Sequence, residues 1–225
     1  VGRVLVAGHS MGGHGAWLLA AALRDSALGV ASSASWLRKD QYSDSNKVHL
    51  HDVANTDVEP ALEALLRAAE GEYDAEAVAG TLAGGLRVLI RVGTEDRSVH
   101  PWFSRRMLRS LLAAGANASE VLLREVPGKE HWWWDTVRSN DGGAVNDEEM
   151  RAFFRECFAR PAGAAALPAA WRLVVHNPAT AGSKGGVSVQ QQLVPFRRSE
   201  VSVRPAPAGA TGGRALLLAE TSNVR

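Results

Sequence analysis

The sequence predicts an α/β fold in which a doubly wound parallel sheet is followed by a small antiparallel β appendage. Over about the first 160 residues, short apolar runs alternate with longer segments of helical periodicity. Beyond Pro161 the chain changes to short alternating segments separated by Gly, Pro and Ser, which indicates antiparallel strands. With 46% hydrophobic and 22% charged residues among 225, the chain can bury a substantial core.

The first part of the chain contains the elements expected of the parallel sheet. Apolar, β-branched runs predict buried strands at 1–7, 27–32, 86–92 and 120–126. Helical patterns cover 12–23, 60–69 and 101–114, and a further helix is expected between Asn146, as its N-cap, and Pro161. Strands that alternate with helices in this way favour a parallel arrangement.

We therefore expect a core over residues 1–160, a linker over 161–170 and a β-rich C-terminal extension over 171–225. Within the extension, alternating patterns predict strands at 172–176, 186–193, 200–204 and 214–219. The chain opens inside a strand pattern and stops directly after another one. This suggests a fragment that lacks the N-terminal strands of its sheet and whose extension is truncated.

Charge and cysteine content exclude some classes of partner. The formal net charge is +1, from 25 basic and 24 acidic residues, which gives no reason to expect nucleic acid or an anionic membrane. No apolar run is long enough for a membrane segment within this stretch. Cys157 is the single cysteine and is expected to be a packed thiol. Compartment and oligomeric state are not predicted.

A reactive serine is predicted where the first strand meets the first helix. Gly8-His9-Ser10-Met11-Gly12 is a G-x-S-x-G motif, with a buried strand before it and a helix after it. In so tight a turn, side chains at Gly8 and Gly12 are expected to clash, so glycine is needed at both positions. The turn would present Ser10 at the helix N-terminus, with the Met11 N–H as a donor to an oxyanion.

A serine hydroxyl needs a base, and the base needs an orienting acid. Asp96 follows the strand at 86–92, and His131 follows the strand at 120–126. Because parallel strands end at one rim of a sheet, Ser10, Asp96 and His131 are expected to meet there as a catalytic triad. Glu95 is the alternative acid, but it lies one residue nearer the strand and fits less well.

These motifs, over residues 1–160, resemble the catalytic domain of prolyl oligopeptidase-type serine peptidases in the α/β-hydrolase superfamily. The resemblance implies that Ser10 is the nucleophile, His131 the general base and then acid, and Asp96 the residue that holds the imidazole tautomer. The tail from Trp171 is not required by that family, and a histidine at the position of His9 is also common in esterases and lipases. Peptide and ester substrates therefore both stay open.

Weaker candidates surround the predicted triad. Trp132 and Trp133 follow His131 directly and could line the substrate cleft, with Trp134 next to them, and His9 could contact substrate. A polar segment contains His49, His51 and Asp52 at a spacing more typical of a solvated surface than of a metal site. We expect no metal and no cofactor.

The sequence thus favours a serine hydrolase that cleaves peptide bonds through an acyl-enzyme on Ser10. Carboxylic-ester hydrolysis on the same triad is the first alternative. A non-catalytic binding protein on a hydrolase scaffold is the second, because a fold alone does not imply activity. A second oxyanion donor is expected to lie upstream of Val1.

Overall fold

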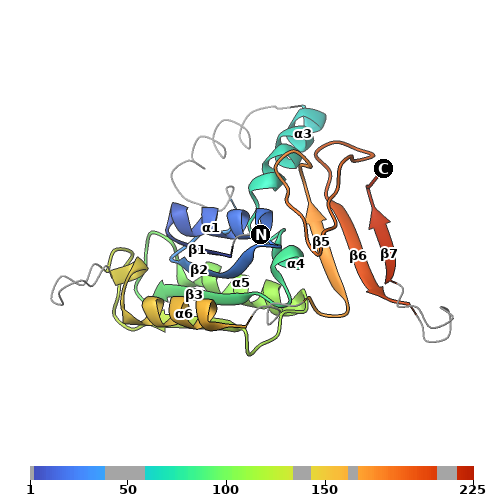
Figure 1. Ribbon diagram of the computed structural model, residues 1–225. Coiled ribbons are helices and arrows are strands. Elements are labelled where there is room, and N and C mark those ends of the chain that lie inside the picture. Colours follow the sequence, from blue (N-terminus) through green and yellow to red (C-terminus); the bar gives the residue numbers. More distant parts are fainter. Residues whose placement is uncertain (1–2, 39–58, 134–142, 162–166, 207–216) are drawn as a thin grey trace.

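The computed structural model describes residues 3–38, 59–133, 143–161, 167–206 and 217–225, apart from the side chains at 63, 66 and 67. These residues form two sheets, a parallel one flanked by helices and an antiparallel one beside it (Figure 1). This confirms the predicted fold class, and the arrangement is consistent with an α/β-hydrolase fold that carries a β appendage. None of the described helices has the length and apolar character needed to span a bilayer.

The first sheet has the order β1-β2-β3-β4, with every neighbouring pair parallel. Its strands are β1 (Val4–His9), β2 (Ala27–Ser33), β3 (Arg87–Gly93) and β4 (Val121–Val126). The helices of this part are α1 (Met11–Ala22), α3 (Pro60–Glu70), η2 (Gly71–Tyr73), α4 (Ala79–Leu82), α5 (Pro101–Ala113), η3 (Gly143–Val145) and α6 (Glu148–Ala159). The four strands predicted from apolar runs are therefore present, each within a few residues of its expected bounds.

The parallel sheet is covered on both faces, which explains why its central strands are mostly apolar. All residues of β2 are buried. One face packs against α1, α4 and α5, with Trp17, Met107 and Leu111 in this core. The other face packs against α6, where Met150 and Phe153 contact residues of β2 and β3. Strands buried on both sides in this way read as continuous apolar runs.

Cys157 lies on the inner face of α6. Its side chain is buried, and a Cβ placed on Gly29 of β2 would lie 2.9 Å from its Sγ. Burial raises the pKa of this thiol to about 11. The thiol is therefore a packing group, as the sequence predicts.

The start of α6 differs from the prediction by one residue. Asp147, not Asn146, is the N-cap, and its carboxylate accepts a hydrogen bond from Met150 N at 2.9 Å. The same carboxylate forms an ion pair with Arg91 of β3. This second partner, distant in sequence, holds Asp147 at the capping position and could not be seen from local pattern.

The second sheet is antiparallel, in the order β5-β6-β7. Its strands are β5 (Trp171–Val175), β6 (Ser199–Pro205) and β7 (Leu217–Ser222). The predicted strand at 186–193 is wrong: this segment forms only isolated bridges, one between Lys184 and Val187 and one between Gln192 and Val224. Positive φ angles of 62° and 75° at Gly185 and Gly186 turn the chain sharply there. The predicted linker overlaps 162–166, which lie outside the described residues, so the domain bounds stay predictions.

Polar contacts join the second sheet to the first part of the chain, and we call this region the junction. Thr81 Oγ1 of α4 accepts a hydrogen bond from Val174 N of β5 at 2.8 Å. Lys184 Nζ donates to Gly80 O at 3.0 Å and to Ala83 O at 2.8 Å, at the end of the same helix. The carboxylate of Asp25 accepts hydrogen bonds from Ser183, Gly185 and Gly186. The two sheets are thus fastened near the C-terminal half of α1 and at α4.

Candidate active site

Ser10 occupies the turn between β1 and α1 in a strained backbone conformation. Its φ is 56° and its ψ is −121°, values that residues other than glycine rarely adopt. The Ser10 N–H donates to Ser33 O of β2 at 2.9 Å, and Ser10 O accepts from His14 N at 3.0 Å. The surrounding backbone therefore holds the turn in place, and the Ser10 side chain is 9% exposed.

The two glycines of the G-x-S-x-G motif have different roles. A Cβ on Gly8 would lie 2.1 Å from Gly12 O, so no side chain fits at that position. At Gly12 a Cβ would meet nothing within 4 Å, so the expected clash at this second position is wrong. The atoms that crowd Gly8 are backbone atoms of residue 12. Any residue at position 12 would therefore crowd Gly8 in the same way.

Gly13 is the second glycine that the turn requires, and it lies outside the G-x-S-x-G motif. A Cβ there would lie 2.8 Å from Ser33 O and 2.9 Å from Ser35 Cβ. The first turn of α1 therefore packs directly on the end of β2. The Gly12-Gly13 pair in the sequence was the available signal, but the sequence does not say which of the two is crowded.

Asp96 lies in the loop after β3 and is fully oriented by hydrogen bonds. Its Oδ1 accepts from Ser98 N at 2.9 Å and from Val99 N at 2.8 Å, and its Oδ2 lies 2.8 Å from His131 Nδ1. Its side chain is completely buried, whereas the neighbouring Glu95 is exposed. Asp96 is therefore the carboxylate that faces the histidine.

His131 connects the other two side chains. Its Nε2 lies 2.9 Å from Ser10 Oγ, while its Nδ1 contacts Asp96. The neutral ring fits this arrangement when Nδ1–H donates to the carboxylate and Nε2 accepts from the serine hydroxyl. The structure thus brings together, within direct hydrogen-bond distance, the three residues that the sequence places at three separate strand ends.

Backbone contacts hold the His131 loop against the end of β3. Glu95 N donates to Lys129 O at 3.0 Å. A Cβ on Gly93 would lie 2.1 Å from the same carbonyl oxygen, so glycine is required there too. Asp96 and His131 therefore keep their separation through the main chain as well as through their own hydrogen bond.

His9 supports the main chain of His131. Its Nε2 donates to His131 O at 2.8 Å, and its ring lies 4.8 Å from the His131 ring and 4.6 Å from the Trp132 ring, between centroids. Burial lowers the pKa of His9, which favours the neutral ring. Because the Nε2–H of His9 is engaged in a hydrogen bond with His131, this side chain is better placed to hold the His131 backbone than to contact substrate.

Trp132 and Trp133 lie in different environments. Trp132 is 58% exposed next to His131, so it can contact a bound molecule. Trp133 is 6% exposed and packs with Ala34 and Ala144, while the Arg91 guanidinium lies 5.7 Å from its ring centroid. Trp133 is therefore a core residue.

A buried polar cluster lies beneath the turn at Ser10. Ser32 Oγ lies 2.9 Å from Gly13 O and 2.7 Å from Ser35 Oγ, which accepts from Trp17 Nε1 at 3.0 Å. His14 stacks on Trp36, with ring centroids 3.5 Å apart. Burial lowers the pKa of His14 to about 4, so its ring is neutral at neutral pH.

The remaining predicted site residues can be placed more briefly. Met11 is the first residue of α1, where backbone N–H groups have no acceptor inside the helix, and its side chain is 73% exposed. His49, His51, Asp52 and Trp134 lie outside the described residues. Within the described part of the chain, no three His, Cys, Asp or Glu side chains gather in a group that could hold a metal ion.

Comparison with known proteins leaves the family of this chain open. No protein-family model matches it. An uncharacterized secreted protein of Arthroderma benhamiae is 27% identical over 202 residues, which cover 90% of this chain and 20% of that protein. The chain thus spans about a fifth of the length of this curated relative.

Several solved hydrolases resemble part of the chain. Porphyromonas gingivalis dipeptidyl peptidase 4 has a TM-score of 0.43 and 16% identity, over 69% of this chain and 19% of that one. Paleococcus ferrophilus monoacylglycerol lipase has a TM-score of 0.42 and 21% identity, over 69% and 66%. An S-formylglutathione hydrolase from Agrobacterium tumefaciens has a TM-score of 0.42 and 24% identity, over 59% and 43%. The names of these three proteins refer to different substrates.

Proposed function

We propose that the chain carries the catalytic site of a serine hydrolase of the α/β-hydrolase superfamily. The observation that supports this is the buried line of two hydrogen bonds, from Ser10 Oγ to His131 Nε2 at 2.9 Å and from His131 Nδ1 to Asp96 Oδ2 at 2.8 Å. A nucleophile, a base within reach of it and an acid that orients the base are the parts that acyl transfer requires.

In the proposed reaction, Ser10 Oγ attacks the carbonyl carbon of the substrate and its proton moves to His131 Nε2. His131 then gives this proton to the leaving amine or alcohol, and an acyl-enzyme on Ser10 results. Water, with His131 again as base, hydrolyses the acyl group. Asp96 stays ionised throughout, holds the ring with Nδ1 protonated and stabilises the imidazolium that forms.

The start of α1 supplies a group for the charge that develops on the substrate oxygen. The N–H of Met11 has no acceptor within the helix, and it follows Ser10 directly. We propose it as one oxyanion donor, which acts together with the positive end of the helix dipole. His9 contributes by holding the backbone of His131, and exposed Trp132 is the proposed contact with substrate.

The proposed substrate is a peptide, and a carboxylic ester is the alternative. The peptide rests on the resemblance of the motifs to prolyl oligopeptidase-type peptidases, while the triad itself serves either bond. Matched anilide and ester substrates with the same acyl group separate the two. A protein that hydrolyses the ester alone would be a carboxylic-ester hydrolase.

The triad assignment predicts the largest mutational effect in the molecule. Ser10→Ala should lower turnover on the order of a million-fold, because the other two residues do not act without the nucleophile. Asp96→Asn should lower it on the order of ten-thousand-fold by stabilising the wrong tautomer of His131. The measurements are the rate of hydrolysis and the labelling of Ser10 by a fluorophosphonate, followed by peptide mass spectrometry.

Glu95→Gln is the matched control for Asp96→Asn, since it neutralises the adjacent, exposed carboxylate. It should change the rate only a few-fold at most, or roughly 1 kcal/mol. Labelling that persists in Ser10→Ala would refute the assignment of the nucleophile. A protein that hydrolyses neither substrate class and takes no label would instead support the non-catalytic alternative.

A further inference from the structure

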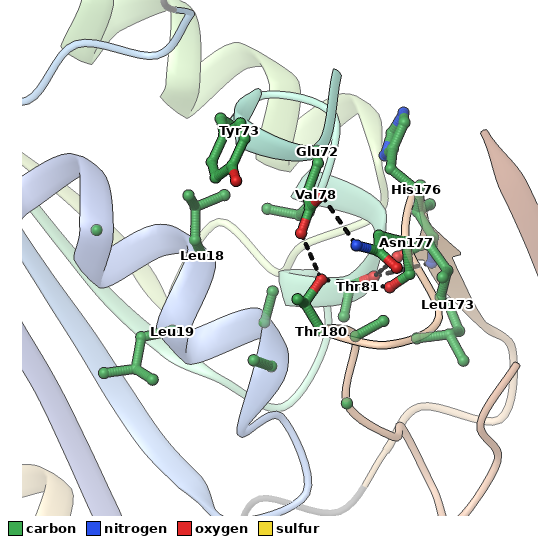
Figure 2. A pocket seen from close by; sticks show the side chains of 17 residues that line it. Leu18, Leu19, Glu72, Tyr73, Val78, Thr81, Leu173, His176, Asn177 and Thr180 are labelled. Carbon is green, nitrogen blue, oxygen red and sulfur yellow. Dashed lines mark hydrogen bonds between the residues drawn. The ribbon is translucent and has the colours of Figure 1, made fainter. Parts of the chain in front are cut away.

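A cleft separate from the triad lies between α1 and the second sheet (Figure 2). Its volume is about 390 Å³, within the range of small-molecule sites. Residues of α1, η2, α4 and β5 line it, together with the turn after β5. The cleft begins at Gly15, more than one helical turn along α1 from Ser10, so its lining does not include the triad.

Most of the lining is apolar. Leu18 and Leu19 form the wall on α1, and Val78 and Leu173 lie across from them (Figure 2). Leu19 is 50% exposed, a large apolar side chain at the opening of the cleft. Such a surface favours a ligand with a hydrocarbon or aromatic body.

One acidic side chain, Glu72, stands at the polar edge of this cleft. Its Oε1 accepts from Thr180 Oγ1 at 2.6 Å, and its Oε2 accepts from Asn177 Nδ2 at 3.1 Å (Figure 2). Both donors come from the turn after β5 and fix the carboxylate in place. Because a carboxylate can accept about four hydrogen bonds, it keeps capacity for a further donor.

Among the residues that the structure describes, Glu72 forms no ion pair with a lysine or an arginine, whereas the neighbouring Asp74 and Glu76 pair with Arg38 and Arg106. His176 also lines the cleft. Burial, and then the charge of Arg198, lower the pKa of its ring, while the charge of Glu72 acts in the opposite direction. Within the described part of the chain, Glu72 is thus a carboxylate that is oriented by neutral donors and has no lysine or arginine partner, at the edge of an apolar cleft.

We propose that this cleft binds a small hydrophobic primary ammonium, whose apolar body packs on Leu18, Val78 and Leu173 and whose cation binds Glu72. A charged donor is favoured over a neutral one because hydrogen bonds between oppositely charged groups are the stronger kind. An anionic ligand is excluded by repulsion from the same carboxylate. The proposal concerns a second ligand site and does not depend on the proposed hydrolysis at Ser10.

Three probes that share a phenyl ring on a short alkyl chain test the proposal on the full chain. One is a cation, one is neutral and one is an anion. Isothermal titration calorimetry should show that phenethylammonium binds and that phenylacetate does not. Neutral phenethyl alcohol should bind with an affinity that is lower by a factor of about ten or more. In Glu72→Gln the ammonium should bind no more tightly than the alcohol. Glu70→Gln, which neutralises a carboxylate outside the cleft lining, should leave the preference for the ammonium intact.

A second variant tests the location independently of charge. Gly15 lines the cleft, and a Cβ placed there meets nothing within 4 Å, so Gly15→Leu can project into the cleft while improving helix propensity. It should abolish binding of phenethylammonium without lowering the unfolding temperature. Binding that survives in a folded Gly15→Leu protein would place the ligand elsewhere and overturn the proposal. Equal binding of the ammonium, alcohol and phenylacetate, or binding of none of them, would overturn it as well.

Discussion

Buried polar groups near the two ends of α1 change charge at very different pH. At its N-terminal end, the turn at Ser10 lies on a cluster that contains His14, whose pKa burial lowers to about 4. Beyond its C-terminal end is the junction, where Lys184 is completely buried. Burial, then the charges of Arg24 and Arg172, lower the pKa of Lys184 to about 7, while Asp25 acts in the opposite direction.

This difference shows that a buried group near the candidate site and a buried group at the appendage change charge in different pH ranges. The His14 ring, beneath the turn at Ser10, stays neutral through the neutral range and down to about pH 4. The amine at the junction, in contrast, gains its proton near neutrality, where it must remain among the carbonyl groups of Gly80 and Ala83. A change of pH around 7 therefore changes the charge of Lys184 at the attachment of the second sheet, whereas the charge of His14 changes only at lower pH.

The largest effect that would test this comparison concerns Lys184→Met. Because the folded pKa of about 7 lies below the reference value of 10.5, the unfolded chain binds this proton more readily between these limits. Lys184 should therefore contribute a rise in the free energy of unfolding with pH across that window, on the order of 5 kcal/mol, and Lys184→Met should lack this contribution. Urea unfolding at several pH values measures it. A variant with the same slope as wild type between pH 7 and 10.5 would contradict the assignment.

A smaller effect in a lower window is expected from His14. Its folded pKa of about 4 lies below the reference value of 6.5, so the unfolded chain again takes up the proton first. The His14 contribution should lower the free energy of unfolding by about 3 kcal/mol as pH drops from 6.5 to about 4, and His14→Asn should remove this loss. Each variant is the control for the other, because His14→Asn should keep the slope above neutrality and Lys184→Met the slope in acid. Loss of both slopes in one variant would show that the two ends of α1 are coupled.

The smallest expected effect comes from substitutions of glycine at the turn that holds Ser10. These variants test backbone packing at this end of α1 without changing any titratable side chain. Gly8→Ala places a Cβ where Gly12 O lies at 2.1 Å, so the turn must shift and hydrolysis should fall by about a hundredfold. Gly12→Ala, the matched change within the same motif, should retain activity because its Cβ meets nothing within 4 Å. Rates are measured with the substrate established for wild type. Equal damage from both substitutions would mean that the crowding at Gly8 is not what the turn depends on.

Local pattern was enough to predict the parallel sheet and its helices. The strands β2 and β3 are buried on both faces, so their apolar runs identify them without knowledge of their neighbours. The order Ser10, Asp96, His131 along the chain could also be read directly, since each residue follows a recognisable strand. The distances between these side chains required the structure.

Features that depend on contacts between distant segments could not be predicted. Asp147 caps α6 and also forms an ion pair with Arg91 of β3. The residues around Asn146 do not indicate that partner, because Arg91 is distant in the sequence. The segment from 186 to 193 alternates like a strand, yet Val189 packs into the second core without joining a ladder. His9 was considered as a contact with substrate, but the carbonyl of His131, more than a hundred residues away, takes its Nε2–H.

The crowded glycines around the Ser10 turn also bear on how diverged relatives of this chain would look. Gly8, Gly13 and Gly93 each lie too close to another segment for a side chain, whereas Gly12 does not. Substitutions should therefore accumulate freely at position 12 during evolution and be purged at the other three. A search pattern written as G-x-S-x-x-G, with a glycine required at the end of the strand before the acid, would retain relatives that the conventional pattern discards.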